Sequence, residues 1–177
     1  MFHHYVGENL PRSEKIEKIV LEEILNSNIP DNKRENSIAW ELKHSSGVIQ
    51  IAKLLAIKRG LDVEKAIAAA ALHDVYAIQT GKYEKHAAKG AEIARELLLS
   101  NGFSKKEIEE ICEAIKLHSE KEKYSGNKLV ELLKDADLLD CLLYDPNIYS
   151  GKPKNIRNAI KKRFRKVCKQ LCLRSFI

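Results

Sequence analysis

The chain has 177 residues, of which 44% are hydrophobic and 32% charged, and its formal net charge at pH 7 is +6. This length fits one ordinary domain, and the composition is that of a folded globular chain rather than a disordered one. The longest apolar run, Ala66 to Leu72, is far shorter than the ~18 residues of a membrane span. The first residues lack the basic start and apolar stretch of a secretory signal, so we expect a cytoplasmic protein with reduced thiols.

Apolar residues recur at helical spacing almost throughout, and no segment alternates as a strand does, so an all-α fold is predicted. Gly47 could divide the second expected helix, and Gly81 marks a loop. The segment Ser104-Lys-Lys-Glu107 matches a capping box, which predicts a helix beginning there. In chain order, the expected helices cover residues 13–26, 35–58, 62–74, 83–99, 104–118, 127–144 and the basic tail.

Positive charge is concentrated at the end of the sequence. From Gly151 onward there are ten Lys or Arg and no Asp or Glu, so the rest of the chain carries a net charge of about −4. Such a tail could bind phosphate groups, nucleic acid or an acidic partner. The simpler interpretation, which we favour at this point, is a solvated helix face.

Histidines and aspartates fall on the apolar faces of the expected helices. His44, His86 and His118 each continue a row of apolar residues spaced by three or four positions, and Asp74 and Asp137 do so on two further helices. An ionised carboxylate taken out of water without a partner is strongly destabilising, so inward aspartates beside inward histidines require a compensating charge. A bound cation supplies that charge. Imidazole and carboxylate ligands suit one or two divalent ions of iron, manganese, nickel, zinc or magnesium.

Each histidine alone is more simply explained as a core residue that is hydrogen-bonded to a backbone carbonyl. Several unrelated buried polar groups, including the adjacent His73 and Asp74, would each need a separate hydrogen-bonding solution. One shared metal site is therefore the preferred interpretation. The cysteines form no C-x-x-C pair and are not expected to bind metal, and no role is assigned to His3 and His4.

Five segments occur in an order that resembles a known family. They are Lys43-His44-Ser-Ser-Gly-Val, Ala-Ala-Ala-Leu-His73-Asp74-Val, His86-Ala-Ala-Lys-Gly-Ala-Glu-Ile-Ala, Ala-Ile-Lys-Leu-His118 and Leu-Lys-Asp-Ala-Asp137-Leu-Leu-Asp140. Together they span roughly residues 37–143 and resemble the HD-domain superfamily of metal-dependent phosphohydrolases. The resemblance implies that one metal is bound by His44, His73, Asp74 and Asp137. It implies that His86 and His118 complete a second metal site, with Asp74 bridging both ions.

The chain also departs from specialised members of that superfamily. The His-Asp pair is followed by Val-Tyr-Ala-Ile rather than by Ile-Gly-Lys or by the Glu-Asp of the alarmone hydrolases. The Gly-Tyr-Pro motif of the cyclic di-GMP phosphodiesterases is absent. The resemblance therefore implies general hydrolysis of a nucleotide or other small phosphoester, in which a metal-activated water is oriented by Asp74.

Three sets of residues could contact the substrate. Lys89 and Lys43 lie close in sequence to His86 and His44 and are predicted to bind its phosphate, as are Arg157 and Lys161 if the tail folds over the pocket. Trp40 could stack a nucleobase, although a single Trp in a helical protein is more often a core residue.

The resemblance also sets the expected domain limits. Residues 1–34 form a helix and linker, residues 35–145 the metal-binding helical core, and residues 146–177 a basic helix packed on that core, all in one structural domain. Two alternatives to hydrolysis stay open. One is a di-iron oxygenase of the same superfamily. The other is a non-catalytic module whose tail binds nucleic acid or a partner helix.

Overall fold

The computed structural model describes residues 9–175, so His3 and His4 lie outside the described range. No strand occurs within that range, which confirms the all-α prediction. A short 3-10 helix, η1 (Asp31–Lys33), separates the first two α-helices. The α-helices are α1 (Arg12–Leu25), α2 (Ile38–Arg59), α3 (Val63–Leu72), α4 (Val75–Thr80), α5 (His86–Ser100), α6 (Lys105–Leu117), α7 (Lys128–Tyr144) and α8 (Lys154–Gln170).

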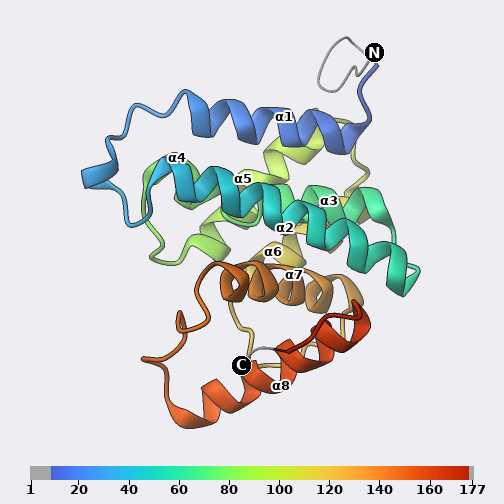
Figure 1. The fold of residues 1–177 in the computed structure, drawn as a ribbon. Coiled ribbons are helices and arrows are strands. Elements are labelled where there is room, and N and C mark those ends of the chain that lie inside the picture. Colours follow the sequence, from blue (N-terminus) through green and yellow to red (C-terminus); the bar gives the residue numbers. More distant parts are fainter. Residues whose placement is uncertain (1–8, 176–177) are drawn as a thin grey trace, which may run out of the picture.

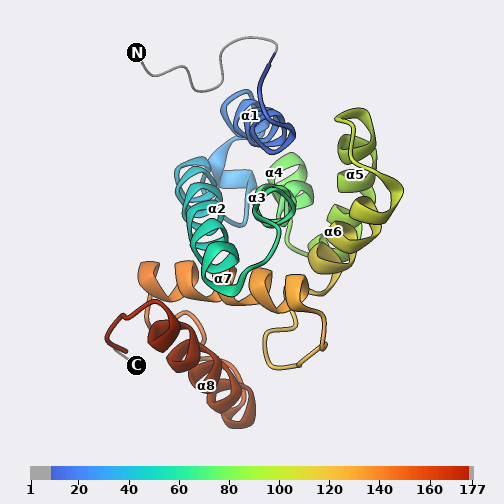
Figure 2. The same cartoon turned by 90° about the vertical axis from the view of Figure 1, so that its right-hand side faces the viewer.

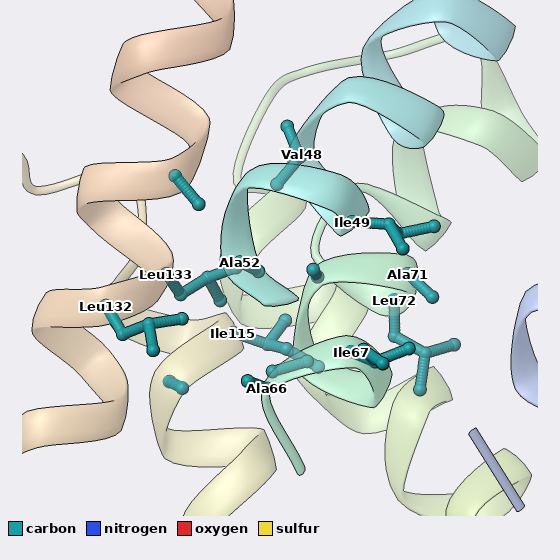
Figure 3. Close-up of a cluster of buried hydrophobic side chains, with 14 of the residues drawn as sticks. Val48, Ile49, Ala52, Ala66, Ile67, Ala71, Leu72, Ile115, Leu132 and Leu133 are labelled. Atoms are coloured by element: carbon teal, nitrogen blue, oxygen red, sulfur yellow. The ribbon is translucent and has the colours of Figure 1, made fainter. Parts of the chain in front are cut away.

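Helix α3 lies at the centre of the bundle, with α1, α2, α4, α5 and α6 around it and α7 across one end (Figures 1 and 2). Its run from Ala66 to Leu72 is buried throughout, and its many alanines allow neighbouring helices to approach on every side. Figure 3 shows side chains of α2, α3, α6 and α7 meeting in this core, among them Val48, Ile115 and Leu133. The centre of the fold is therefore a helix that is apolar on all faces.

Two details differ from the sequence-based expectations. Gly47 does not divide α2, which continues to Arg59 and ends at Gly60 with a left-handed φ of 61°. The helix expected to include His73 and Asp74 ends at Leu72, and Asp74 precedes α4. Helix α4 was not predicted because its six residues are too few to show a periodic apolar pattern. His73 and Asp74 thus occupy a helix junction, where both side chains can turn toward one point.

The basic tail forms α8, which packs on the side of α7 that faces away from the rest of the bundle (Figure 2). Ile160, Phe164 and Val167 are buried in this contact, while the other face of α8 presents lysine and arginine side chains to solvent. Among the described residues, no helix combines the length and apolarity that crossing a membrane requires.

We expect Phe164→Ala to destabilise the whole chain by about 3–5 kcal/mol, because it removes a fully buried ring that joins α8 to the core. Chemical denaturation followed by circular dichroism should show one transition at lower denaturant. Lys161→Ala, at an exposed position of the same helix, is the control and should change stability little. An early separate loss of α8 helicity, with an unchanged main transition, would contradict a single cooperative domain.

Candidate metal centre

Six predicted ligands converge in one cluster, and all of them except His73 line an open pocket of about 460 Å³. His44 comes from α2, His86 begins α5, and His118 follows the last residue of α6. Asp137 lies in the middle of α7, while His73 and Asp74 come from the α3–α4 junction. Residues from distant parts of the chain therefore meet because their helices surround α3.

One half of the cluster contains His44, His73, Asp74 and Asp137. The Nε2 atoms of His44 and His73 are 3.2 Å apart, and His73 Nε2 is 3.3 Å from Asp74 Oδ2. His44 Nε2 lies 3.6 Å from Asp137 Oδ1 and 3.8 Å from Asp74 Oδ2. These four side chains are at most 5% exposed.

The other half of the cluster contains His86 and His118, whose Nε2 atoms are also 3.2 Å apart. They lie 3.3 Å and 3.4 Å from Asp74 Oδ1. Asp74 therefore directs one carboxylate oxygen at each pair of imidazoles. This arrangement divides the six residues into two donor sets that share Asp74.

All four imidazoles are oriented by contacts to Nδ1, the ring nitrogen that faces away from the centre of the cluster. Nδ1 of His73 and His118 lies 2.7 Å and 2.6 Å from the carbonyl oxygens of Ala70 and Ile115, which stand in the last turns of α3 and α6. His86 Nδ1 lies 2.8 Å from the Tyr83 carbonyl oxygen, and His44 Nδ1 lies 2.6 Å from Asp140 Oδ2. Since these partners only accept hydrogen bonds, each Nδ1 carries the proton. Whenever such a ring is neutral, as a metal ligand is, the lone pair of its Nε2 points toward the centre.

This geometry can be tested against a bound cation. Ligand atoms about 2.0–2.1 Å from one ion are separated by about 3.0 Å at right angles and about 3.4 Å in a tetrahedron. The distances in the set of His86, His118 and Asp74, 3.2–3.4 Å, match those values, whereas in the other set they range from 3.2 to 3.8 Å. Asp74 Oδ1 is buried and accepts no hydrogen bond within the described residues, although a buried carboxylate oxygen normally does. The cluster therefore fits a divalent ion, and two overlapping groups that share His73, namely His44–His73–Asp137 and His73–Asp74–His118, bring three ligand atoms close enough to hold one.

Positive charge near Asp74 and Asp137 lowers the pKa of both carboxyl groups. Burial would raise the pKa of Asp137, but the ammonium of Lys121, with Nζ 2.5 Å from Oδ2, holds it well below its usual range. Burial would likewise raise the pKa of Asp74, and His73 and His118 lower it instead. In return, Asp74 outweighs the effect of burial on His73 and raises the pKa of His73 to about 9. The protein thus draws a proton onto His73 where a cation would otherwise compensate the carboxylates.

Four further residues in this region were not predicted from the sequence. Asp140 orients His44, and Lys121 contacts Asp137. The Tyr83 hydroxyl lies 3.3 Å from Asp74 Oδ2 and 3.1 Å from the buried carboxylate of Glu41. Each of the four stands three positions from a predicted ligand. For Glu41 on α2 and Asp140 on α7, that spacing places both side chains on one face of a helix and is a sequence signal that could have found them. Tyr83 and Lys121 lie outside the helices, where the spacing carries no such signal.

The predicted substrate-binding residues are placed differently from one another. Lys89 Nζ donates to Tyr76 Oη at 2.7 Å and does not line the metal pocket. Lys43 lies near the pocket, with Nζ 5.7 Å from the ring centre of Tyr144. Trp40 lines the pocket and stacks on His44, with ring centroids 4.3 Å apart. Arg157 and Lys161 line a separate cavity, so α8 does not fold over the metal pocket. The substrate roles of Lys89 and Lys43 stay predictions.

Comparison with known proteins identifies the family. Residues 42–145, more than half of the chain, match the HD domain. The chain belongs to the HD domain family. A crystal structure of a predicted HD superfamily hydrolase from an uncultured Thermotogales bacterium has the same fold. It is 27% identical, with a TM-score of 0.61, and the match covers 97% of this chain and 96% of that one. The resemblance found in the sequence is confirmed.

Two curated proteins are also similar to this HD domain chain. "Putative phosphohydrolase YueE" of Bacillus subtilis is 35% identical over 112 residues, which is 55% of this chain and 64% of YueE. Ribonuclease Y of Mycoplasma mycoides is 49% identical over 55 residues, which is 30% of this chain and 13% of that protein. The chain therefore spans less than two thirds of the length of either relative.

Substitution of Gly47 tests whether Asp140 orients His44 for metal binding. A Cβ atom built at Gly47 would clash with Asp140, so Gly47→Ala must displace the carboxylate that holds His44 Nδ1. We expect metal affinity to fall about 10–100-fold, as other losses of such outer contacts do. Titration with Mn²⁺ by calorimetry measures it, and Asp140→Ala should behave alike. Gln50→Ala, on the exposed face of α2, is the control. Wild-type affinity in both Gly47→Ala and Asp140→Ala would contradict the assignment.

Glu41 predicts a pH effect on stability. Burial and the nearby charge of Asp74 raise the pKa of Glu41 from 4.5 to about 7. A carboxyl whose pKa is raised on folding stabilises the protein below its unfolded pKa and loses that contribution as pH rises through the folded value. In chelator, Glu41→Gln should therefore match wild type in melting temperature at pH about 5 and exceed it at pH about 8. A difference that does not change between these two pH values would contradict the assignment.

Proposed function

We propose that this chain is a metal-dependent phosphohydrolase that acts on a nucleotide or another small phosphoester. One observation carries the proposal. Four imidazoles, each held by a hydrogen bond at Nδ1, direct Nε2 toward the shared, buried carboxylate of Asp74. The relatives support the same chemistry, since the names of YueE and ribonuclease Y both denote cleavage of phosphoester bonds. A metal-dependent hydrolase is the function that accounts for both.

Six residues would hold the metal ions. His44, His73, Asp137 and one oxygen of Asp74 would form one site, and His86, His118 and the other oxygen of Asp74 would form the second. Bound there, divalent ions would lower the pKa of water from 15.7 toward ~7 and offset negative charge on the phosphoryl oxygens. Iron, manganese, nickel, zinc and magnesium all accept such a mixture of ligands.

The remaining pocket residues would bind and orient the substrate. Asp74, placed between both donor sets and hydrogen-bonded by Tyr83, would hold the attacking water in line with phosphorus. Lys121 lines the pocket beside Asp137 and would place its ammonium near a phosphoryl oxygen. Trp40 and Tyr144 supply aromatic walls against which a nucleobase or another planar group would pack.

The test combines metal analysis with a substrate screen. Anaerobically purified protein should contain stoichiometric transition metal or magnesium by elemental analysis. It should release phosphate from members of a panel of nucleotides and sugar phosphates in anoxic buffer. Asp74→Ala should lose metal, and its activity should fall more than about 100-fold, since weaker outer-shell changes already cost 10–100-fold. Glu96→Ala, which removes an exposed carboxylate of α5, is the control and should behave as wild type.

Two outcomes would contradict the proposal. An Asp74→Ala variant as active as wild type would show that the cluster is not the catalytic site. Substrate-dependent oxygen uptake without phosphate release in anoxic buffer would instead identify a di-iron oxygenase, which the same ligand set could support.

A further inference from the structure

A second, larger hollow lies next to the metal pocket. This basic groove, about 950 Å³ in volume, is formed by the end of α2, the segment 121–128, the first turns of α7 and one face of α8. Acidic residues also line it, namely Glu122, Glu131 and Asp135. Its positively charged lining residues are Lys58, Arg59, Lys121, Lys128, Lys162, Arg163 and Lys166.

Two of the acidic residues are already neutralised within the protein. Arg163 pairs with Glu131 at 2.6 Å and with Asp135 at 2.7 Å, and Arg59 pairs with Asp135 at 2.6 Å. Glu122, which is exposed, remains as one carboxylate at the rim. Lys58, Lys128, Lys162 and Lys166 are all exposed, and none forms an ion pair with any described residue. The groove therefore presents a surplus of uncompensated ammonium groups.

The groove is held rigidly beside the metal pocket. Arg163 of α8 donates hydrogen bonds to the carbonyl oxygens of Lys121 and Lys123, and the buried Lys134 donates to that of Lys123. These contacts fix the loop whose first residue, Lys121, reaches Asp137. Lys121 lines both hollows, so the groove and the metal pocket meet at this side chain.

The same loop adds an aromatic side chain to the groove. Tyr124 lines it and is 76% exposed, although a large ring gains little by projecting into water. Lysines that follow a groove, interrupted by an exposed aromatic ring, are the combination that binds single-stranded nucleic acid, because phosphates meet the ammonium groups and bases stack on the ring. An acidic protein surface would use the lysines but would need neither a hollow nor a ring.

We propose that the basic groove binds single-stranded nucleic acid and leads its phosphodiester chain past Lys121 to the metal centre. The second part rests on the proposed hydrolase function and narrows its substrate to oligonucleotides. In the reaction, a water oxygen bonds to phosphorus as a P–O ester bond breaks, and the leaving oxygen takes a proton to become a hydroxyl. The products are a phosphate monoester end and a hydroxyl end.

Binding is tested by fluorescence anisotropy with labelled oligo(U) and oligo(dT) of about 12 nucleotides. The probe's length is checked on a denaturing gel after each measurement. The variant Lys128→Ala/Lys162→Ala/Lys166→Ala should bind at least about tenfold more weakly, and the slope of log affinity against log salt should fall by about 2, or ~0.7 per lost phosphate contact. Tyr124→Ala should weaken binding with an unchanged salt slope. Lys105→Ala/Lys106→Ala/Lys116→Ala, at exposed positions of α6, is the charge-matched control.

The outcomes separate this inference from the hydrolase proposal. Hydrolysis of bis(p-nitrophenyl) phosphate should be unchanged in the triple variant, because none of its three lysines lines the metal pocket. The proposal that the groove binds nucleic acid is overturned if the triple variant retains oligonucleotide binding. It is also overturned if the α6 control loses binding to the same extent. Displacement of the labelled probe by poly-glutamate at lower concentration than by unlabelled oligonucleotide would also overturn it and indicate an acidic protein. Groove-dependent binding by a protein that hydrolyses neither the oligonucleotide, nor bis(p-nitrophenyl) phosphate, nor any member of the nucleotide and sugar phosphate panel would support the groove and reject the hydrolase.

Discussion

The buried carboxylate of Asp74 is the constraint on which the rest of the site depends. It lies among four imidazoles, and Oδ1 accepts no hydrogen bond from any described residue. Such a group is tolerated in the interior only when positive charge is brought to it. The raised pKa of His73 and the ammonium of Lys121 beside Asp137 show the protein supplying part of that charge itself. Bound cations would supply the remainder. The same ions would therefore stabilise the buried carboxylates and support the proposed hydrolysis.

The imidazoles are held by two different means. His73, His86 and His118 donate Nδ1–H to carbonyl groups three residues earlier in the chain, so their orientation follows from local helix ends. His44 instead depends on Asp140, which is 96 residues away on α7. That contact requires α2 and α7 to approach closely, and Gly47 permits it because any Cβ there would occupy the space of the Asp140 carboxylate. The packing of α2 against α7 thus controls the orientation of the His44 imidazole.

Helix α8, which carries most of the excess positive charge, contacts the loop that borders the metal centre. Its apolar row packs on α7, and Arg163 extends from it to hold the loop that carries Lys121. Lys162 and Lys166 of this helix line a groove that Lys121 of the same loop also lines. A segment that composition alone suggests to be a solvated face is therefore partly structural, and its exposed charge lies where a polyanionic substrate would approach.

The sequence by itself determined the helical class, most helix positions and the six residues that converge, because inward histidines and aspartates stand out against helical apolar periodicity. Only the tertiary structure decided which oxygen of Asp74 faces which imidazole pair, how Asp140 reaches His44, and that Lys89 turns toward Tyr76. It also decided the course of α4, which is too short to leave a periodic signal. The physical reason is range: periodicity reports which face of a helix is buried, whereas contacts between helices depend on packing that no linear pattern encodes.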